Sequence, residues 1–114
     1  MRWFKKPNQR PSSGLANEWS FSAASILASV FKGLPNVQLV GVTTDGSSGN
    51  SVKITLPNSG LRIKLSTMVF FQKNGQILDD IGTKPDIIIE RNLDQVVWKE
   101  DYQLQKLKEL ILKK

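Results

Sequence analysis

Residues 18–31 read EWSFSAASILASVF, a turn rich in serine and alanine that runs directly into an apolar helical pattern. Large apolar side chains recur at steps of three and four residues, at Leu27, Val30, Phe31 and Leu34. This period predicts a helix over residues 20–34 with one broad face buried. Ser20 or Ser22 falls at the predicted N-cap, where a hydroxyl can bond an unpaired N–H group of the first turn. Those N–H groups also favour a developing negative charge, so the position suits a nucleophile as well as a cap.

The 114 residues form one domain or part of one, with room for a single modest core. A hydrophobic content of 39% and a charged content of 23% argue against global disorder. The sequence contains no cysteine and no histidine. Disulfides, thiolate metal sites and the common zinc sites are therefore excluded, and no metal or cofactor is predicted. A Ser-His-Asp triad cannot be completed within the chain, so a general base has to be a lysine or come from elsewhere.

The formal net charge is +6, but the basic residues are spread over the predicted strands, turns and last helix. That distribution does not favour nucleic-acid binding. No apolar run approaches the roughly 18 residues of a membrane span. Met1–Lys6 lacks the apolar stretch of a signal peptide. The sequence predicts a soluble chain and leaves its compartment open.

The rest of the chain alternates between turn-forming residues and short apolar runs. Residues 1–17 combine prolines, a glycine and basic residues without sustained periodicity, which predicts a flexible basic arm ahead of a folded part over residues 18–114. The predicted order is helix, strand, hairpins, strand, helix. The elements after the first helix are a strand at 37–42, a hairpin of 52–56 with 61–66, a second hairpin around Asn74–Gly75, and a strand at 87–89. The strand at 87–89 is predicted to be covered on both faces. A last helix is predicted to be capped by Asp101 and to bury Leu104, Leu107, Leu110 and Ile111.

Between the first predicted strand and the first hairpin, residues 43–51 are suited to turns throughout. These nine residues are more than a connection requires, which indicates a site loop. Gly41, Gly46 and Ser47 match the spacing of a phosphate-binding loop, but Ser47 stands where that loop needs its lysine. The following segment also alternates like a strand, where a helix would be required, so no nucleotide site is predicted.

Four segments in this order resemble the C-terminal half of the C-terminal-processing (tail-specific) and tricorn-core serine peptidases. The segments are SAASILA at 22–28, VGVTTDG at 40–46, LPNSGL at 56–61 and GTKPDI at 82–87. The resemblance covers about residues 18 to 112. It implies an α/β fold with a crotonase/ClpP-like ββα core, of which this chain supplies the C-terminal part.

The resemblance also implies site residues. Ser22 falls at the nucleophile position of the family, and the backbone N–H of Ala23 at a donor of its oxyanion hole. Processing-type members use a lysine base at a position that Ser47 occupies here. Tricorn-type members use a histidine from the N-terminal half and an acidic residue just before the Gly-x-x-Pro-Asp motif, which fits Asp79, with Asp80 as the near alternative. An ordinary turn carboxylate is the other interpretation of Asp79.

Two functional hypotheses follow. In the first, the chain is the nucleophile-bearing part of a serine-type endopeptidase that hydrolyses polypeptides through an acyl-enzyme. Its partners would be a polypeptide substrate and an N-terminal peptidase segment or another chain that supplies the base, with a homo-oligomer as a further option. In the second, the chain is a non-catalytic peptide-binding or scaffold module derived from that fold. Members of the family are often exported or periplasmic.

Overall fold

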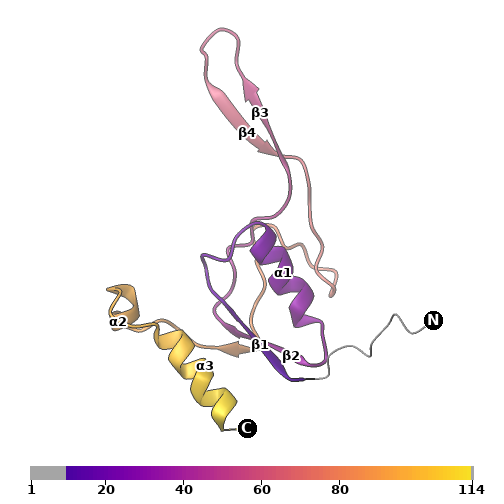
Figure 1. The fold of residues 1–114 in the computed structure, drawn as a ribbon. Helices are drawn as coiled ribbons and strands as arrows, with labels where there is room; N and C mark the ends of the chain where they lie inside the picture. Colours follow the sequence, from indigo (N-terminus) through magenta and orange to yellow (C-terminus); the bar gives the residue numbers. More distant parts are fainter. Residues whose placement is uncertain (1–9, 114) are drawn as a thin grey trace, which may run out of the picture.

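A three-stranded parallel sheet and one helix form the body of the molecule in this computed structural model, which describes residues 10–113 (Figure 1). The strand order is β1-β2-β5, and both neighbouring pairs run parallel. Helix α1 connects β1 to β2 and packs against both strands. The bounds are β1 Ser12–Ala16, α1 Ala23–Lys32, β2 Val37–Gly41 and β5 Ile87–Ile88. The predicted mixed α/β class is confirmed.

Strand β1 corrects the expectation of an arm at residues 1–17. Its five residues pair with β2 in parallel register, from Ser12 opposite Val37 to Ala16 opposite Gly41. The prediction of a loop at residues 12–16 is wrong because serine and glycine rarely favour strands, and pairing with the distant β2 overrides that local preference. Residues 1–9 lie outside the described residues.

Helix α1 buries a different face from the one that the sequence predicted. Its buried residues are Ser25, Ala28 and Ser29. Leu27 and Val30 are 51% and 52% exposed, so the prediction that their face is buried is wrong. Small side chains face the strands because α1 lies close to them, and a hydrophobicity pattern gives more weight to the larger residues. Phe31 does reach the sheet, with its ring 3.7 Å from the position that a Cβ on Gly14 would occupy.

The first predicted hairpin is confirmed and stands away from the body (Figure 1). It consists of β3 (Ser51–Thr55) and β4 (Arg62–Ser66), which pair only with each other in the part of the chain that the structure describes. One face carries Val52 opposite Leu65 and Ile54 opposite Ile63, and the other carries Lys53 opposite Lys64. The second predicted hairpin is reduced to a single bridge between Phe71 and Ile77.

The C-terminal segment forms two helices, α2 (Leu93–Val96) and α3 (Tyr102–Leu112). The predicted cap is confirmed, since Asp101 Oδ1 accepts a hydrogen bond from Leu104 N at 3.0 Å. The predicted buried face is only partly right. Leu107 is buried, but Leu104 and Ile111 are exposed, and the buried partner of Leu107 is Gln103, whose amide donates to Ile89 O at 2.7 Å.

Strand β5 is less covered than the sequence predicted. Ile88 is 55% exposed, so the prediction of a β5 strand covered on both faces is wrong. Among the described elements only β2 packs extensively against β5, and a short apolar run does not reveal whether another layer covers the faces of a strand. Among residues 10–113, no helix has both the length and the apolar character to cross a membrane.

Candidate active site

Ser22 has an unusual backbone conformation at the start of α1. Its φ and ψ angles are 53° and −126°, and its side chain makes no capping hydrogen bond. A positive φ at a residue other than glycine costs about 1–3 kcal/mol and persists only where the surroundings impose it. The other predicted cap, Ser20, is also engaged elsewhere, since its Oγ accepts a bond from Asn17 N at 3.1 Å. The exposed Ser22 hydroxyl is therefore not used to stabilise the helix.

The N–H group of Ala23 is the first of α1 and directly follows Ser22. We call these two residues, at the entrance of the helix, the Ser22 corner. No acceptor for it is found within residues 10–113. Such N–H groups, together with the dipole of the ten-residue helix, favour negative charge next to the N-terminus. The corner therefore combines a free hydroxyl with a free N–H donor beside it.

Asp79 is held at both carboxylate oxygens. Its Oδ1 accepts from Ser48 Oγ at 2.5 Å, and its Oδ2 accepts from Phe70 N at 2.9 Å. The hydrogen bond from Ser48, followed by that from Phe70, lowers the pKa of the Asp79 carboxyl below its ordinary value. Asp80 has a left-handed backbone, with φ at 68°, and its own N–H donates to Gly46 O at 3.0 Å.

The loop at residues 43–51 connects Ser22 to Asp79. Ser22 N donates to Ser47 Oγ at 3.2 Å, and the next residue, Ser48, donates to Asp79. The two predicted site residues therefore lie on either side of one pair of adjacent serines. The predicted site loop thus contacts both of them, and Ser47 contacts the nucleophile candidate directly.

A buried network of hydrogen bonds between α1 and the neighbouring loops was not predicted from the sequence. Ser25 Oγ and Thr44 Oγ1 share a hydrogen bond of 2.9 Å, and Thr83 N donates to Thr44 Oγ1 at the same distance. All three residues are buried, and the network joins α1 to the loops that carry Ser47 and Asp79. The available signal was the set of serines at 22, 25 and 29, which recur at helical spacing inside an apolar helix.

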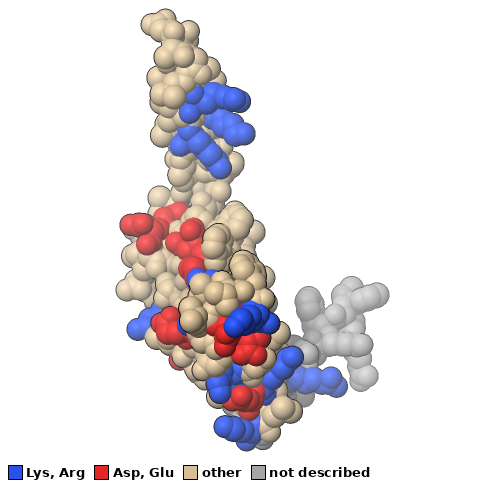
Figure 2. Space-filling view, turned by 90° about the vertical axis from the view of Figure 1, so that its left-hand side faces the viewer, with Lys and Arg blue, Asp and Glu red and all other residues tan. Residues whose placement is uncertain are grey.

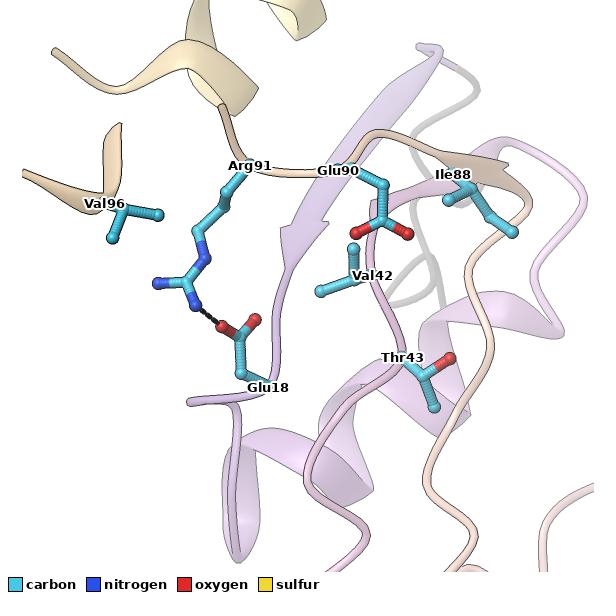
Figure 3. A pocket seen from close by; sticks show the side chains of 7 residues that line it. All are labelled: Glu18, Val42, Thr43, Ile88, Glu90, Arg91 and Val96. Atoms are coloured by element: carbon cyan, nitrogen blue, oxygen red, sulfur yellow. Dashed lines mark ion pairs between the residues drawn. The ribbon is translucent and has the colours of Figure 1, made fainter. Parts of the chain in front are cut away.

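Two cavities flank the segment that leads to Ser22. One of about 400 Å³ is lined by Trp19, Phe21 and Ser47, together with Glu18 and Asp45. The other, of about 470 Å³, is drawn in Figure 3, where the Arg91 guanidinium forms an ion pair with the Glu18 carboxylate. Glu18 lines both cavities, so the ion pair lies between the Ser22 corner and the segment that follows β5.

Residues 4–89 match Peptidase family S41, and the chain belongs to that family. The match includes β1 and most of the segment that was expected to be an arm, and it ends before α2. The chain thus has a serine peptidase relationship, and its resemblance to the processing and tricorn-type enzymes is confirmed.

Individual relatives agree with this. The carboxy-terminal-processing protease of Bartonella bacilliformis is 26% identical over 88 residues, which are 77% of this chain and 20% of that protein. The structure of mature CPAF complexed with lactacystin has a TM-score of 0.79 and 26% identity over 91% of this chain. The tricorn protease shares the fold, with a TM-score of 0.72 at 20% identity over 89% of this chain. The chain spans 20% of the CPAF chain and 10% of the tricorn chain.

Proposed function

We propose that this chain is the nucleophile-bearing part of a serine-type endopeptidase that cleaves polypeptides through an acyl-enzyme. The observation that supports it is the Ser22 corner, where an exposed hydroxyl sits on a strained turn at a helix entrance without a capping bond. Serine nucleophiles of other hydrolases occupy strained strand-to-helix turns for the same reason, because such a turn presents the hydroxyl to the substrate. The fold proposed for the complete enzyme is a crotonase/ClpP-like ββα core.

Each site residue has a role in the proposed reaction. Ser22 Oγ attacks the scissile carbonyl carbon while the base takes its proton, and the tetrahedral oxyanion is stabilised by the N–H of Ala23. The base then returns the proton to the leaving amine, and water hydrolyses the ester. Asp79 orients the base. Because the sequence contains no histidine, a histidine base would come from another segment or another chain.

The non-catalytic module remains the second candidate, and one observation favours it. Both oxygens of Asp79 already accept hydrogen bonds from within the chain, as expected of a carboxylate that only holds loops together. Each oxygen nevertheless keeps a second lone pair, which could accept an imidazole N–H. Peptide binding without turnover is the activity expected from this alternative.

The test supplies the chain with a histidine-bearing N-terminal peptidase segment, by co-expression or within a longer natural chain, and adds a fluorophosphonate probe. Ser22 is expected to be labelled, and Ser22→Ala is expected to abolish labelling and turnover. Ser20→Ala is the matched control, since the Ser20 hydroxyl is occupied by Asn17 N. Labelling that survives Ser22→Ala would contradict the assignment, and a folded assembly that is never labelled would favour the non-catalytic module.

The isolated 114-residue chain is expected to have no measurable peptidase activity, because it contains no histidine and Ser47 replaces the family's lysine. An unfolded protein substrate and a gel readout are sufficient to check this. Activity that disappears with Ser22→Ala would mean that a lysine of the chain acts as the base. Lys53 and Lys64, which lie exposed on the hairpin, would then have to be tested.

A further inference from the structure

We propose that the adjacent residues Ser47 and Ser48 are the positioning residues of this site, Ser47 for Ser22 and Ser48 for Asp79. Their catalytic consequence rests on the proposed function. The two hydrogen bonds themselves do not, and they can be measured in the chain alone. Neither serine is expected to react with the substrate.

Ser47 holds the strained corner through a closed set of contacts. Its Oγ accepts the Ser22 N–H at 3.2 Å, and its own N–H donates to Asp45 Oδ2 at 3.1 Å. Asp45 N in turn donates to Ser20 O at 3.2 Å. The loop is therefore bonded to the corner on both sides of Phe21. Because a positive φ at serine is unfavourable by itself, these bonds are the local interactions that can maintain it.

Ser48 holds the acidic group. Its half-buried hydroxyl donates to Asp79 Oδ1 at 2.5 Å, while Phe70 N binds Oδ2 from the other side. A short bond from a hydroxyl to an ionised carboxylate is among the stronger hydrogen bonds in proteins. With both oxygens bound, rotation of the carboxylate about its Cβ–Cγ bond is restricted, so its remaining lone pairs point in fixed directions.

The loop around the two serines is clamped by close contacts at the glycines on either side of them. A Cβ on Gly46 would lie 2.6 Å from Gly82 N, and a Cβ on Gly49 would lie 2.8 Å from Met68 Cβ. Real Cβ atoms do not approach other atoms so closely, so both glycines are in tight contact with their neighbours. The serine pair is thus fixed at both ends and can transmit its position to Ser22 and Asp79.

The first test measures Asp79 by NMR titration of its carboxyl carbon in the 114-residue chain. Ser48→Ala is expected to raise the pKa of Asp79 toward its ordinary value, because it removes the largest cause of the lowering, and Ser48→Thr is expected to restore it. Ser59→Ala, in the hairpin turn, is the matched control and should change nothing. An unchanged Asp79 titration in folded Ser48→Ala would overturn the role of Ser48.

The second test measures hydrogen exchange at the Ser22 amide. Ser47→Ala is expected to speed this exchange by about tenfold or more, which corresponds to the loss of one hydrogen bond, whereas Ser47→Thr and Ser48→Ala should leave it near the wild-type rate. Unchanged exchange in folded Ser47→Ala would overturn the role of Ser47.

The third test uses the assembly that contains the base. Ser47→Ala should slow fluorophosphonate labelling of Ser22 about tenfold with rescue by Ser47→Thr, and Ser48→Ala should lower kcat with little change in KM. If both NMR results hold but Ser22 is never labelled, the hydrogen bonds stand and the proposed function fails. If Ser22 is labelled normally in every variant, the positioning proposal fails and the proposed function stands.

Discussion

The two sheets found in residues 10–113 both contain large apolar side chains, but they differ in what covers those side chains. In the parallel sheet, Leu39 and Val40 of β2 are 2% and 0% exposed. In the β3–β4 hairpin, Ile54 and Leu65 are 43% and 48% exposed although they lie on one continuous apolar face with Val52 and Ile63. Alternating apolar residues therefore specify a strand, but they do not specify whether the face of that strand is covered.

The two sheets also differ in the distance along the chain over which they are assembled. The hairpin pairs residues on either side of a short turn, in which Gly60 takes a φ of 69°. The parallel sheet pairs Ser12 with Val37 and Val40 with Ile87, so it forms only when distant segments meet. Stability should thus be concentrated in the parallel sheet, and paired substitutions in the two regions can test this.

The largest difference is expected between two glycines with positive φ. A Cβ on Gly41 would lie 1.9 Å from Ala16 O, whereas a Cβ on Gly60 would meet nothing within 4 Å. Gly41→Ala should therefore cost at least about 3 kcal/mol by forcing β1 from β2, in addition to backbone strain. Gly60→Ala should cost about 1–2 kcal/mol, from strain alone. Urea unfolding measures both, and equal losses would contradict the comparison.

Truncation of a large side chain should give the next largest effect. Leu39→Ala removes atoms from the buried cluster of Ala16, Ala28 and Leu39 and is expected to cost about 2–5 kcal/mol. Ile54→Ala, its counterpart on the hairpin, should cost less than about 1 kcal/mol because much of that side chain already contacts water. Thermal unfolding of the two variants is the check. A hairpin variant that loses as much as Leu39→Ala would show that the hairpin face is covered.

Helix α1 allows the same comparison within one element. Val30→Asp should cost less than about 1 kcal/mol, because Val30 is 52% exposed and a new carboxylate there stays hydrated. Ala28→Asp, on the buried face of the same helix, is the reference variant and should lose much more stability, because it places an unpaired charge in the core. Urea unfolding distinguishes the two. A loss of several kcal/mol in Val30→Asp would restore the helix face that the sequence predicted.

The smallest effect concerns acid pH at the base of the hairpin. Because hydrogen bonds lower the pKa of Asp79 in the folded chain, its contribution to stability is complete above the ordinary carboxyl value of about 3.9 and is lost as the pH falls through the lowered value. Over that window, exchange of the Phe70 amide should accelerate relative to the Ile89 amide, which donates to Gly41 O. Equal protection of both amides down to global unfolding would contradict this.

The sequence predicted the elements that depend on neighbouring residues. The hairpin, strand β2 and the Asp101 cap follow from local alternation and capping chemistry, and the structure confirms them. Strand β1 was missed because Ser12 and Ser13 become strand residues only through pairing with β2. The face of α1 was misassigned because close packing on a sheet selects small side chains, and hydrophobicity does not report how closely two elements approach.

For the candidate site, the resemblance gave Ser22, Ala23 and Asp79, whose roles stay proposals. The serine pair between them could not be assigned, because Ser47 and Ser48 lie in a run of residues that are all suited to turns. Only the folded chain shows that these two hydroxyls face different partners. The positive φ of Ser22 likewise depends on residues that are distant in the sequence and close in space, so the flanking sequence does not predict it.

The lysines of the hairpin affect how one molecule associates with another. Basic side chains gather along the hairpin in Figure 2, and Lys53 lies directly opposite Lys64. Like charges facing each other weaken the strand pair slightly, by a few tenths of a kcal/mol to about 1 kcal/mol. The same charges make the open edges of one molecule repel those of the next, which opposes edge-to-edge stacking into fibrils. These lysines thus oppose association through an exposed strand pair that has one apolar face, at a small cost in the stability of the pair.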